Sequence, residues 1–297
     1  MLCSIDENPF KITNIEKYQI IDSLKKVYTI EKLASLLNIT SRAYRKWISK
    51  GKPIANNFND DHAELILVEH LNNFEVYGTL RLKYHLLKKL NVNFNHKKIL
   101  RYKNILNLKT ITRKKKSISR RIQVKRNKSY MAENLLNCNF KAEKPRSKYS
   151  TDVSYINCSD GRLYLSAIKD LYSKQIISYD LSNKNDTDLI INTLKGVNLR
   201  GSILHSDQGS LYYSWSYRNH LEKNECLRSM SRPGACWENS PIENWFSQLK
   251  EEQLRRIGKQ SKSETRKSIK KYVQWYNTER IQKDLNYQSP IQFLNSN

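Results

Sequence analysis

The chain has 297 residues, with 53 Lys and Arg against 28 Asp and Glu, so its net charge is +25. A surplus of that size indicates a polyanionic partner, because Lys and Arg contacts to phosphates supply most sequence-independent affinity for nucleic acids. An RNA-packaging or ribosomal protein also fits the charge. The sequence shows no apolar run near the roughly 20 residues of a membrane span, no signal-peptide pattern and no C-x-x-C pair among its cysteines, so we expect a cytoplasmic protein without a zinc site.

The first predicted unit, residues 1–55, consists of three helices. Apolar residues recur with helical spacing over 14–27 and 30–37, and Thr40 or Ser41 can cap a third helix over 41–48. That third helix has Trp47 on one side and cations on the other: Arg42, Arg45 and Lys46. A helix, a short helix, a turn and a basic helix form the pattern of a helix-turn-helix DNA-binding unit. The alternative is a small bundle with a solvated basic face.

A second helical unit is predicted over residues 56–112, after the break at Gly51-Lys52-Pro53. Two helices are expected at 62–74 and 79–90, and Asn95 can cap a third that ends near Lys103. This last helix is also basic, and its expected DNA contacts are Lys97, Lys98 and Arg101. A basic linker over 113–145 follows. It begins with the candidate DNA contacts Arg113, Lys114, Lys115 and Lys116, and is either an arm along a phosphate backbone or a solvated connection.

Residues 146–297 have the composition of an α/β domain. Strands are expected at 148–158, 162–171, 175–181 and 202–205, with a helix through Leu194 before the last of them. Further helices are expected at 213–222, 240–254 and 263–280. Three antiparallel strands followed by a helix and a parallel strand predict an RNase H-like catalytic core, which is a mixed five-stranded sheet with flanking helices.

Three acids stand at positions where this fold brings them together. Asp152 lies inside the first strand, Asp207 follows the last strand 55 residues later, and Glu243 begins a helix 36 residues after Asp207. Converging carboxylates suit two divalent ions, Mg²⁺ or Mn²⁺, because hard cations prefer oxygen ligands. Two such ions stabilise both the attacking and the leaving oxygen of a phosphodiester.

Each acid also has a simpler interpretation. Asp152 could be a surface acid on an edge strand, and Asp207 could be a turn former. Glu243 completes a Ser-x-x-Glu capping box with Ser240, which alone favours a structural role. Lys250 stands two helical turns after Glu243, so it either binds a DNA phosphate beside the metals or is a solvated lysine.

These residues resemble the transposases of the insertion-sequence-three (IS-three) family, specifically the product of their second reading frame, OrfB. Those proteins are DDE recombinases with a retroviral-integrase-type catalytic core. The matching segments are Thr151-Asp152-Val153-Ser154-Tyr155-Ile156, Leu163 to Leu171, His205-Ser206-Asp207-Gln208-Gly209-Ser210, Ser229 to Gly234, Tyr276-Asn277 with Arg280, and Ser289-Pro290. The 35 residues between Asp207 and Glu243 match the spacing of the family, Lys250 matches its basic residue, and Glu75-Val76-Tyr77-Gly78 extends the match toward the N-terminus.

The resemblance implies cleavage and strand transfer on double-stranded DNA, by a homo-oligomer in the bacterial nucleoid. It also implies a partner or fusion partner, OrfA, from the upstream frame. Glu238 and Gln282 depart from the family pattern, in which Asp and His are usual. Two other functions stay open: a DNA-binding regulator with an inactive core, and an RNase H-type nuclease.

Overall fold

The computed structural model describes residues 13–52, 58–112 and 132–296. They divide into two compact units, one within residues 1–67 and 101–108 and the other within 68–100 and 109–297. The predicted contacts Arg113, Lys114, Lys115 and Lys116 lie outside the described residues. None of the described helices is both long and apolar enough to cross a lipid bilayer.

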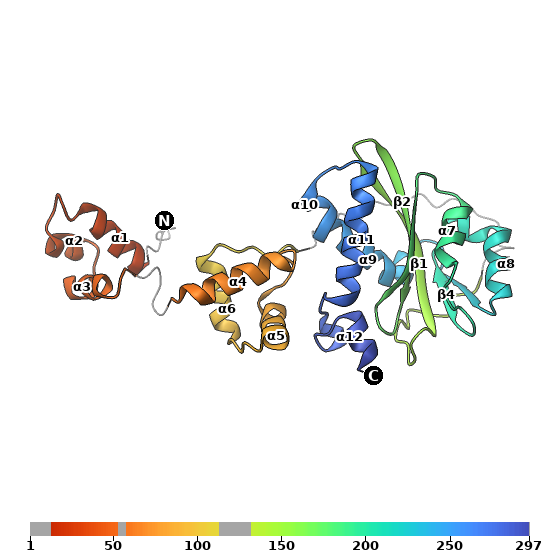
Figure 1. The fold of residues 1–297 in the computed structure, drawn as a ribbon, viewed down its shortest axis with the longest axis horizontal. Helices are drawn as coiled ribbons and strands as arrows, with labels where there is room; N and C mark the ends of the chain where they lie inside the picture. The colour runs from red at the N-terminus through yellow and green to blue at the C-terminus, as the bar shows by residue number, and fades with distance from the viewer. Residues whose placement is uncertain (1–12, 53–57, 113–131, 297) are drawn as a thin grey trace, which may run out of the picture. The chain divides into compact units, whose positions relative to one another are not determined.

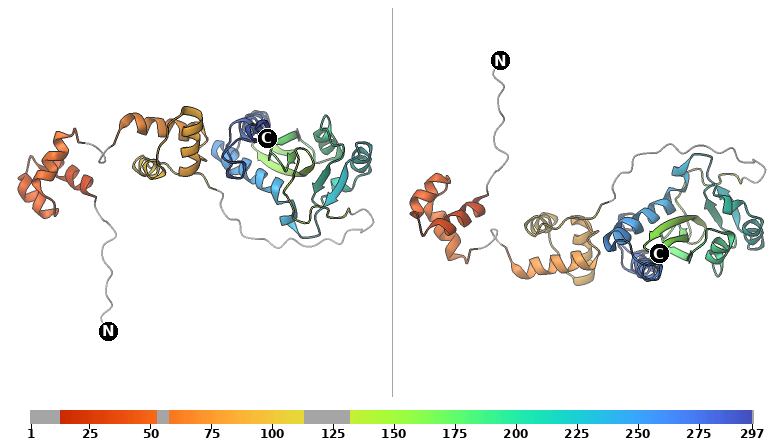
Figure 2. Two further views of the ribbon diagram at one scale, coloured as in Figure 1. Left: turned by 90° about the horizontal axis from the view of Figure 1, so that it is seen from below. Right: turned by 90° about the horizontal axis from the view of Figure 1, so that it is seen from above.

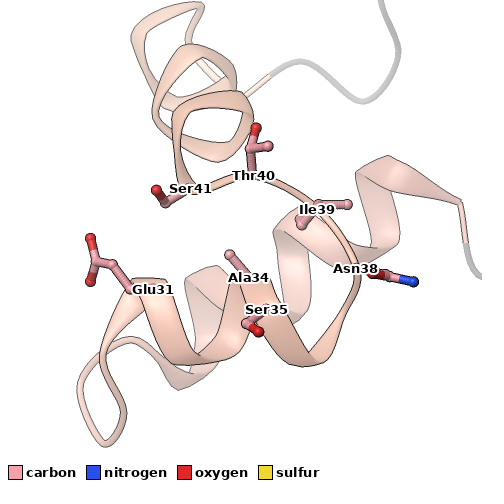
Figure 3. A pocket seen from close by; sticks show the side chains of 7 residues that line it. All are labelled: Glu31, Ala34, Ser35, Asn38, Ile39, Thr40 and Ser41. Atoms are coloured by element: carbon pink, nitrogen blue, oxygen red, sulfur yellow. The ribbon is translucent and has the colours of Figure 1, made fainter.

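The first unit contains the three predicted N-terminal helices: α1 (Asn14–Leu24), α2 (Ile30–Leu36) and α3 (Ser41–Ser49) (Figure 1). Their core includes Ile21, Tyr44 and Trp47, so the aromatic side of the basic helix α3 faces inward. The Thr40 hydroxyl caps α3 by accepting a bond from the Ala43 N–H at 3.2 Å, as predicted. A pocket at the turn between α2 and α3 is lined by polar and small side chains (Figure 3).

Three more helices follow in the chain: α4 (Asp60–Asn72), α5 (Thr79–Leu90) and α6 (His96–Ile105). The all-helical N-terminal region is therefore confirmed. The predicted boundaries at residues 55 and 112 stay a prediction. The two compact units have other boundaries, since helix α4 is divided between them and residues 101–108 belong to the first unit.

The sheet has five strands: β1 (Lys148–Cys158), β2 (Gly161–Asp170), β3 (Ile176–Ser182), β4 (Ile203–Ser206) and β5 (Leu227–Met230). They lie in the order β3-β2-β1-β4-β5. The first three pair antiparallel, whereas β4 pairs parallel with β1 and β5 parallel with β4. The mixed five-stranded sheet is as predicted, although the sequence did not locate β5.

Helices cover both faces of this sheet (Figures 1 and 2). On one side are α7 (Thr187–Leu194) and α8 (Trp215–Lys223), with the short 3₁₀ turn Ser210–Tyr213. On the other side are α9 (Ser240–Leu249), α10 (Arg255–Ile257), α11 (Lys262–Thr278) and α12 (Pro290–Asn295), with 3₁₀ turns at Cys236–Asn239 and Lys283–Leu285. Between α9 and α10, residues Lys250–Leu254 form one π-helical turn.

Each helical layer is held by its own apolar core. Tyr149, Leu204 and Leu221 belong to the cluster under α7 and α8. Trp245 of α9 and Tyr272 of α11 are completely buried on the other face. Each such side chain contributes roughly 1.5–3 kcal/mol on burial, so α9, which carries Glu243, and α11 are both firmly attached to the sheet.

Within the second unit, the segment before α5 packs against α11. The Tyr77 hydroxyl accepts a bond from the Ile281 N–H at 3.0 Å and donates one to the Glu279 carbonyl at 3.2 Å. The Phe74 ring meets the edge of Trp275, with centroids 4.6 Å apart. The motif Glu75-Val76-Tyr77-Gly78 thus connects the helical region with the end of α11.

Candidate active site

The pairing of β1 with β4 brings Asp152 and Asp207 together. Lys148 pairs with Ile203 and Ser150 with His205, so partners are 55 positions apart in the sequence. Extended by two residues, the same register places Asp152 beside Asp207, just past the end of β4. Because neighbouring strands run about 4.8 Å apart, the two side chains emerge next to each other. The interval of 55 residues between the two acids equals the register of this strand pair.

The turn after β4 fixes the Asp207 carboxylate. The Gly209 N–H donates to Asp207 Oδ1 at 2.7 Å. A β-carbon at position 209 would lie only 2.9 Å from that oxygen, so the close approach requires glycine. Asp207 is therefore held by its own loop, as a turn residue is, while its position beside Asp152 makes it available to a ligand shared by the two acids.

Glu243 reaches the same region because the start of α9 is bonded to the sheet. The Asn239 side chain donates to the Thr151 carbonyl at 3.1 Å, one residue before Asp152. From β2, Lys169 Nζ donates to the Pro241 carbonyl at 3.1 Å. These two bonds place the first turn of α9 over the part of β1 that carries Asp152.

The simpler interpretation of Glu243, a capping box with Ser240, is wrong. Ser240 has helical dihedral angles and is the first residue of α9, whereas the N-cap is Asn239, which makes no side-chain capping bond. The physical reason is the tertiary bond of the Asn239 amide to Thr151, which fixes the helix start one residue earlier than the motif indicates.

The charges of the three acids act on one another. Burial raises the pKa of Asp152 well above its usual value, and the negative charges of Asp207 and Glu243 raise it further. A bond from the Val153 N–H and the positive charge of Lys250 oppose the rise in this pKa. The pKa of Tyr212 is raised as well, by burial and then by Asp152 and Asp207, so this ring borders both acids.

Lys250 lies beside the acids. Its Nζ donates to Ser154 Oγ at 2.6 Å, and Ser154 is two residues after Asp152, hence on the same face of β1. Lys250 also opens the π-helical turn, and such turns occur frequently at functional sites. Arg280 stabilises this turn through a bidentate ion pair with Glu252, at 2.5 and 2.8 Å.

The donor set fits a hard divalent cation. All three acids offer carboxylate oxygens, and the side chain of each is partly accessible to solvent. Asp152 and Asp207 are also neighbours in the register of β1 and β4. A cation would relieve the mutual repulsion that raises the pKa of Asp152. In the described part of the chain, no three His, Cys, Asp or Glu side chains already stand in the arrangement of a bound metal ion.

The residues that depart from the family pattern have structural contacts. Glu238 is completely buried and accepts bonds from the backbone N–H and the guanidinium of Arg232, each at 2.6 Å. Gln282 forms an isolated β-bridge with Gln288. The Glu238 carboxylate thus forms an ion pair with Arg232.

The predicted DNA contacts of the helical region lie mostly at the surface. Arg42, Arg45 and Lys46 are exposed on α3, and Arg45 forms an exposed ion pair with Glu31 at 2.6 Å. Lys97 is exposed. Lys98 lies over the Phe94 ring at 4.1 Å from its centroid, and Arg101 over Tyr102 at 5.3 Å. Their contact with DNA remains a prediction.

No role was predicted from the sequence for several side chains around the acids, although they lie among the residues that match the family. Asn239 and Lys169 orient α9, and Tyr212 borders two of the acids. The signal for Lys169 was a cation after the apolar pair Ala167-Ile168 in a strand, where a buried charge needs a specific partner. Nothing local in the sequence indicates the roles of Asn239 and Tyr212, because each depends on contacts between elements far apart in the chain.

Comparison with known proteins agrees with this geometry. A model of the integrase core domain matches residues 142–236, and a second integrase core domain model matches residues 224–290. An uncharacterized transposase-like protein of Haemophilus influenzae is 37% identical over 206 residues, covering 68% of this chain and 94% of that protein. InsK, named for insertion sequence element IS150 of Escherichia coli K12, is 30% identical over 289 residues, covering 93% of this chain and 97% of InsK.

Transposase InsF for insertion sequence IS3A of Escherichia coli K12 is 25% identical over 289 residues, covering 95% of this chain and 99% of InsF. The matches thus extend over the helical region as well as the sheet. The five-stranded sheet, the integrase-core matches and these relatives together show that the chain belongs to the insertion-sequence-three (IS-three) family of DDE transposases.

Proposed function

We propose that Asp152, Asp207 and Glu243 are the catalytic residues of this transposase and bind two divalent ions, Mg²⁺ or Mn²⁺. The register of β1 and β4 carries the proposal, because it makes the positions of Asp152 and Asp207 neighbours where β4 ends, close to the start of α9. The carboxylates of Asp152, Asp207 and Glu243 would hold the ions, and these would supply Lewis-acid chemistry at the phosphate.

The bound ions would supply an activated water or DNA 3′-hydroxyl and would stabilise the departing oxygen. The protein positions the ligands. Gly209 fixes Asp207, while Asn239 and Lys169 fix the turn that carries Glu243. Lys250 is close enough to influence Asp152 and provides a cation for the phosphate next to the scissile bond. With these roles the chain cleaves a DNA strand and joins its 3′ end to another.

The proposed substrate is double-stranded DNA at the ends of the insertion sequence and at its target. The exposed cations of α3, the exposed Lys97 and half-buried Lys98 and Arg101 of α6, and the predicted contacts at 113–116 are expected to bind the phosphate backbone. Two DNA ends must meet for joining, so we propose that the chain acts as a homo-oligomer on DNA. An OrfA partner and a location in the bacterial nucleoid belong to the same proposal.

The test is a cleavage and joining assay on duplexes that carry the element ends. The wild-type chain should cut and join only with Mg²⁺ or Mn²⁺, and Asp152→Asn and Asp207→Asn should lose orders of magnitude in rate, because the ions stabilise charge that develops mainly in the transition state. A chain that binds DNA but never cuts it is a regulator. One that cuts RNA–DNA hybrids without joining is an RNase H-type nuclease.

A further inference from the structure

Tyr155 is an exposed aromatic residue in the central strand of the sheet. Its side chain is 55% exposed and lies in the half of β1 that pairs with β2 alone, because the pairing of β1 with β4 ends at Ser150. The other long aromatic side chain of that strand, Tyr149, is completely buried. Large aromatic rings usually bury much of their surface, so the exposed ring of Tyr155 is available to a ligand.

Two cations from different elements flank this ring. The Arg162 guanidinium of β2 lies 4.9 Å from the ring centroid, and Lys250 Nζ lies 5.2 Å from it. Cation–π contacts at exposed positions stabilise a fold only slightly. A purely structural role therefore gives little reason to keep a large ring at the surface between two positive charges.

The ring is linked to the proposed active site through Lys250, although the alternation of side chains places Tyr155 on the opposite face of β1 from Asp152 and Ser154. Lys250, which contacts it, also donates to Ser154 at 2.6 Å and lowers the pKa of Asp152. On the other side, Tyr155 shares a strand face with Asn157 and with Arg162 across the pair, and both of these are exposed. The exposed strip therefore runs from Lys250 toward the tip of the β1–β2 hairpin.

A further cation stands at the tip of that hairpin. Lys262 Nζ lies 3.2 Å from the point that a β-carbon on Gly161 would occupy. The strip thus combines an aromatic face with positive charges at both ends. Proteins that bind single-stranded nucleic acid use this combination, with bases stacked on rings and phosphates on cations.

We propose that Tyr155 is a stacking platform for an unpaired base of the DNA end, with the cations of Arg162 and Lys250 binding the adjoining phosphates. The inference rests on the proposed function and adds a binding residue to the same site. The base must be unpaired, because the faces of bases inside a duplex are covered by their neighbours. The platform therefore implies that the DNA opens locally beside the scissile bond.

The experiment uses the full chain and a duplex of the element end with 2-aminopurine beside the scissile bond. Binding is measured without divalent ions, so that no strand is cut, and stacking is followed by quenching of the 2-aminopurine fluorescence. Tyr155→Phe should quench as the wild type does. Tyr155→Ala should lose the quenching and bind about 5- to 150-fold more weakly, which is the affinity ratio expected for one base stacked on an aromatic ring.

Trp215→Ala is the matched control, because Trp215 is also an exposed aromatic residue, at the first position of α8. It should bind and quench like the wild type. Tyr155→Leu keeps apolar bulk without an aromatic face, so it should lose the quenching even where the alanine variant unfolds. Melting curves of all variants verify that they are folded.

Several results would overturn the inference. Unchanged quenching in Tyr155→Ala means that no base stacks there, and equal defects in Phe and Ala variants mean that the hydroxyl acts instead of the ring. A change of oligomeric state with unchanged quenching marks a protein contact. Failure of the proposed function looks different, since the wild-type chain would then fail to cut DNA with any divalent ion, whatever the quenching shows.

Discussion

Replacing Arg280 by methionine removes the cation of a buried ion pair that contacts the π-helical turn next to the proposed active site. The side chains of Arg280 and Glu252 are only 3% and 9% exposed. Arg280 donates two bonds to Glu252, at 2.5 and 2.8 Å, and the Tyr272 hydroxyl donates a third at 2.7 Å. Glu252 belongs to the π-helical turn that begins at Lys250, so the pair also fixes the position of that lysine.

The expected loss of stability follows from the charge that stays behind. Methionine preserves much of the packing of the arginine stem, but it leaves the buried Glu252 carboxylate without its hydrogen-bonded cation, and only the more distant charge of Arg81 still acts on it. Breaking a buried pair in this way costs about 3–5 kcal/mol. For a unit of this size, each kcal/mol lowers the melting temperature by roughly 2–4 °C, so we expect a decrease of about 6–20 °C.

Urea unfolding of four proteins measures this effect: the wild type, Arg280→Met, Glu252→Gln and the double variant. The double variant contains no buried charge at this place and keeps an acceptor for Tyr272, so it should be more stable than Arg280→Met alone. The coupling energy should reach about 1–3 kcal/mol. A loss below about 1 kcal/mol in Arg280→Met, or strict additivity in the double variant, would refute the role given to this pair.

Three further predictions concern the surroundings of the acids and the helical region. Gly209→Ala has an ordinary backbone conformation but places a β-carbon 2.9 Å from Asp207 Oδ1, so metal-dependent cleavage should fall sharply with little change in melting temperature, and normal cleavage contradicts this. Burial lowers the pKa of Lys169 to about 7 in the folded chain, so the unfolded state binds more protons above that pH and stability should rise from pH 7 toward pH 10. Lys169→Met should flatten that rise in urea unfolding, and an unchanged slope speaks against the lowered pKa. Deleting residues 1–130 should weaken DNA binding and reduce its dependence on salt, because phosphate-binding cations are lost; the same salt slope in both proteins shows that the helical region does not bind DNA.

The sequence was sufficient for the parts of the fold that depend on regular apolar patterns. The strand-like runs around Asp152 and before Asp207 predicted β1 and β4, and their separation already contained the register of the parallel pair. Strand β5 escaped prediction because it has only four residues and begins with Leu227, which is 58% exposed. It becomes a strand through its pairing with β4, which no local pattern reveals.

Contacts between distant elements account for the other differences. The Ser240 motif indicates a capping box, but the bond of Asn239 to Thr151 decides where α9 begins. The π-helical turn inserts an irregularity that helical periodicity does not predict, and the ion pair with Arg280 supports it from another helix. Likewise, the sequence predicts Tyr77 in a separate helical unit, whereas its hydroxyl forms hydrogen bonds with the backbone of Glu279 and Ile281.

Comparing Glu243→Gln with the wild type tests the assignment of the active site most directly. Glutamine has nearly the same size as glutamate but cannot provide a charged ligand to a hard divalent ion. Since Ser240 is not the N-cap, the start of α9 does not depend on a capping box with Glu243. Melting temperature and Mg²⁺-dependent cleavage and joining are measured on the same preparation. We predict a nearly unchanged melting temperature and a loss of orders of magnitude in both reactions. Retained cleavage with lowered stability would contradict the assignment and make Glu243 a structural residue.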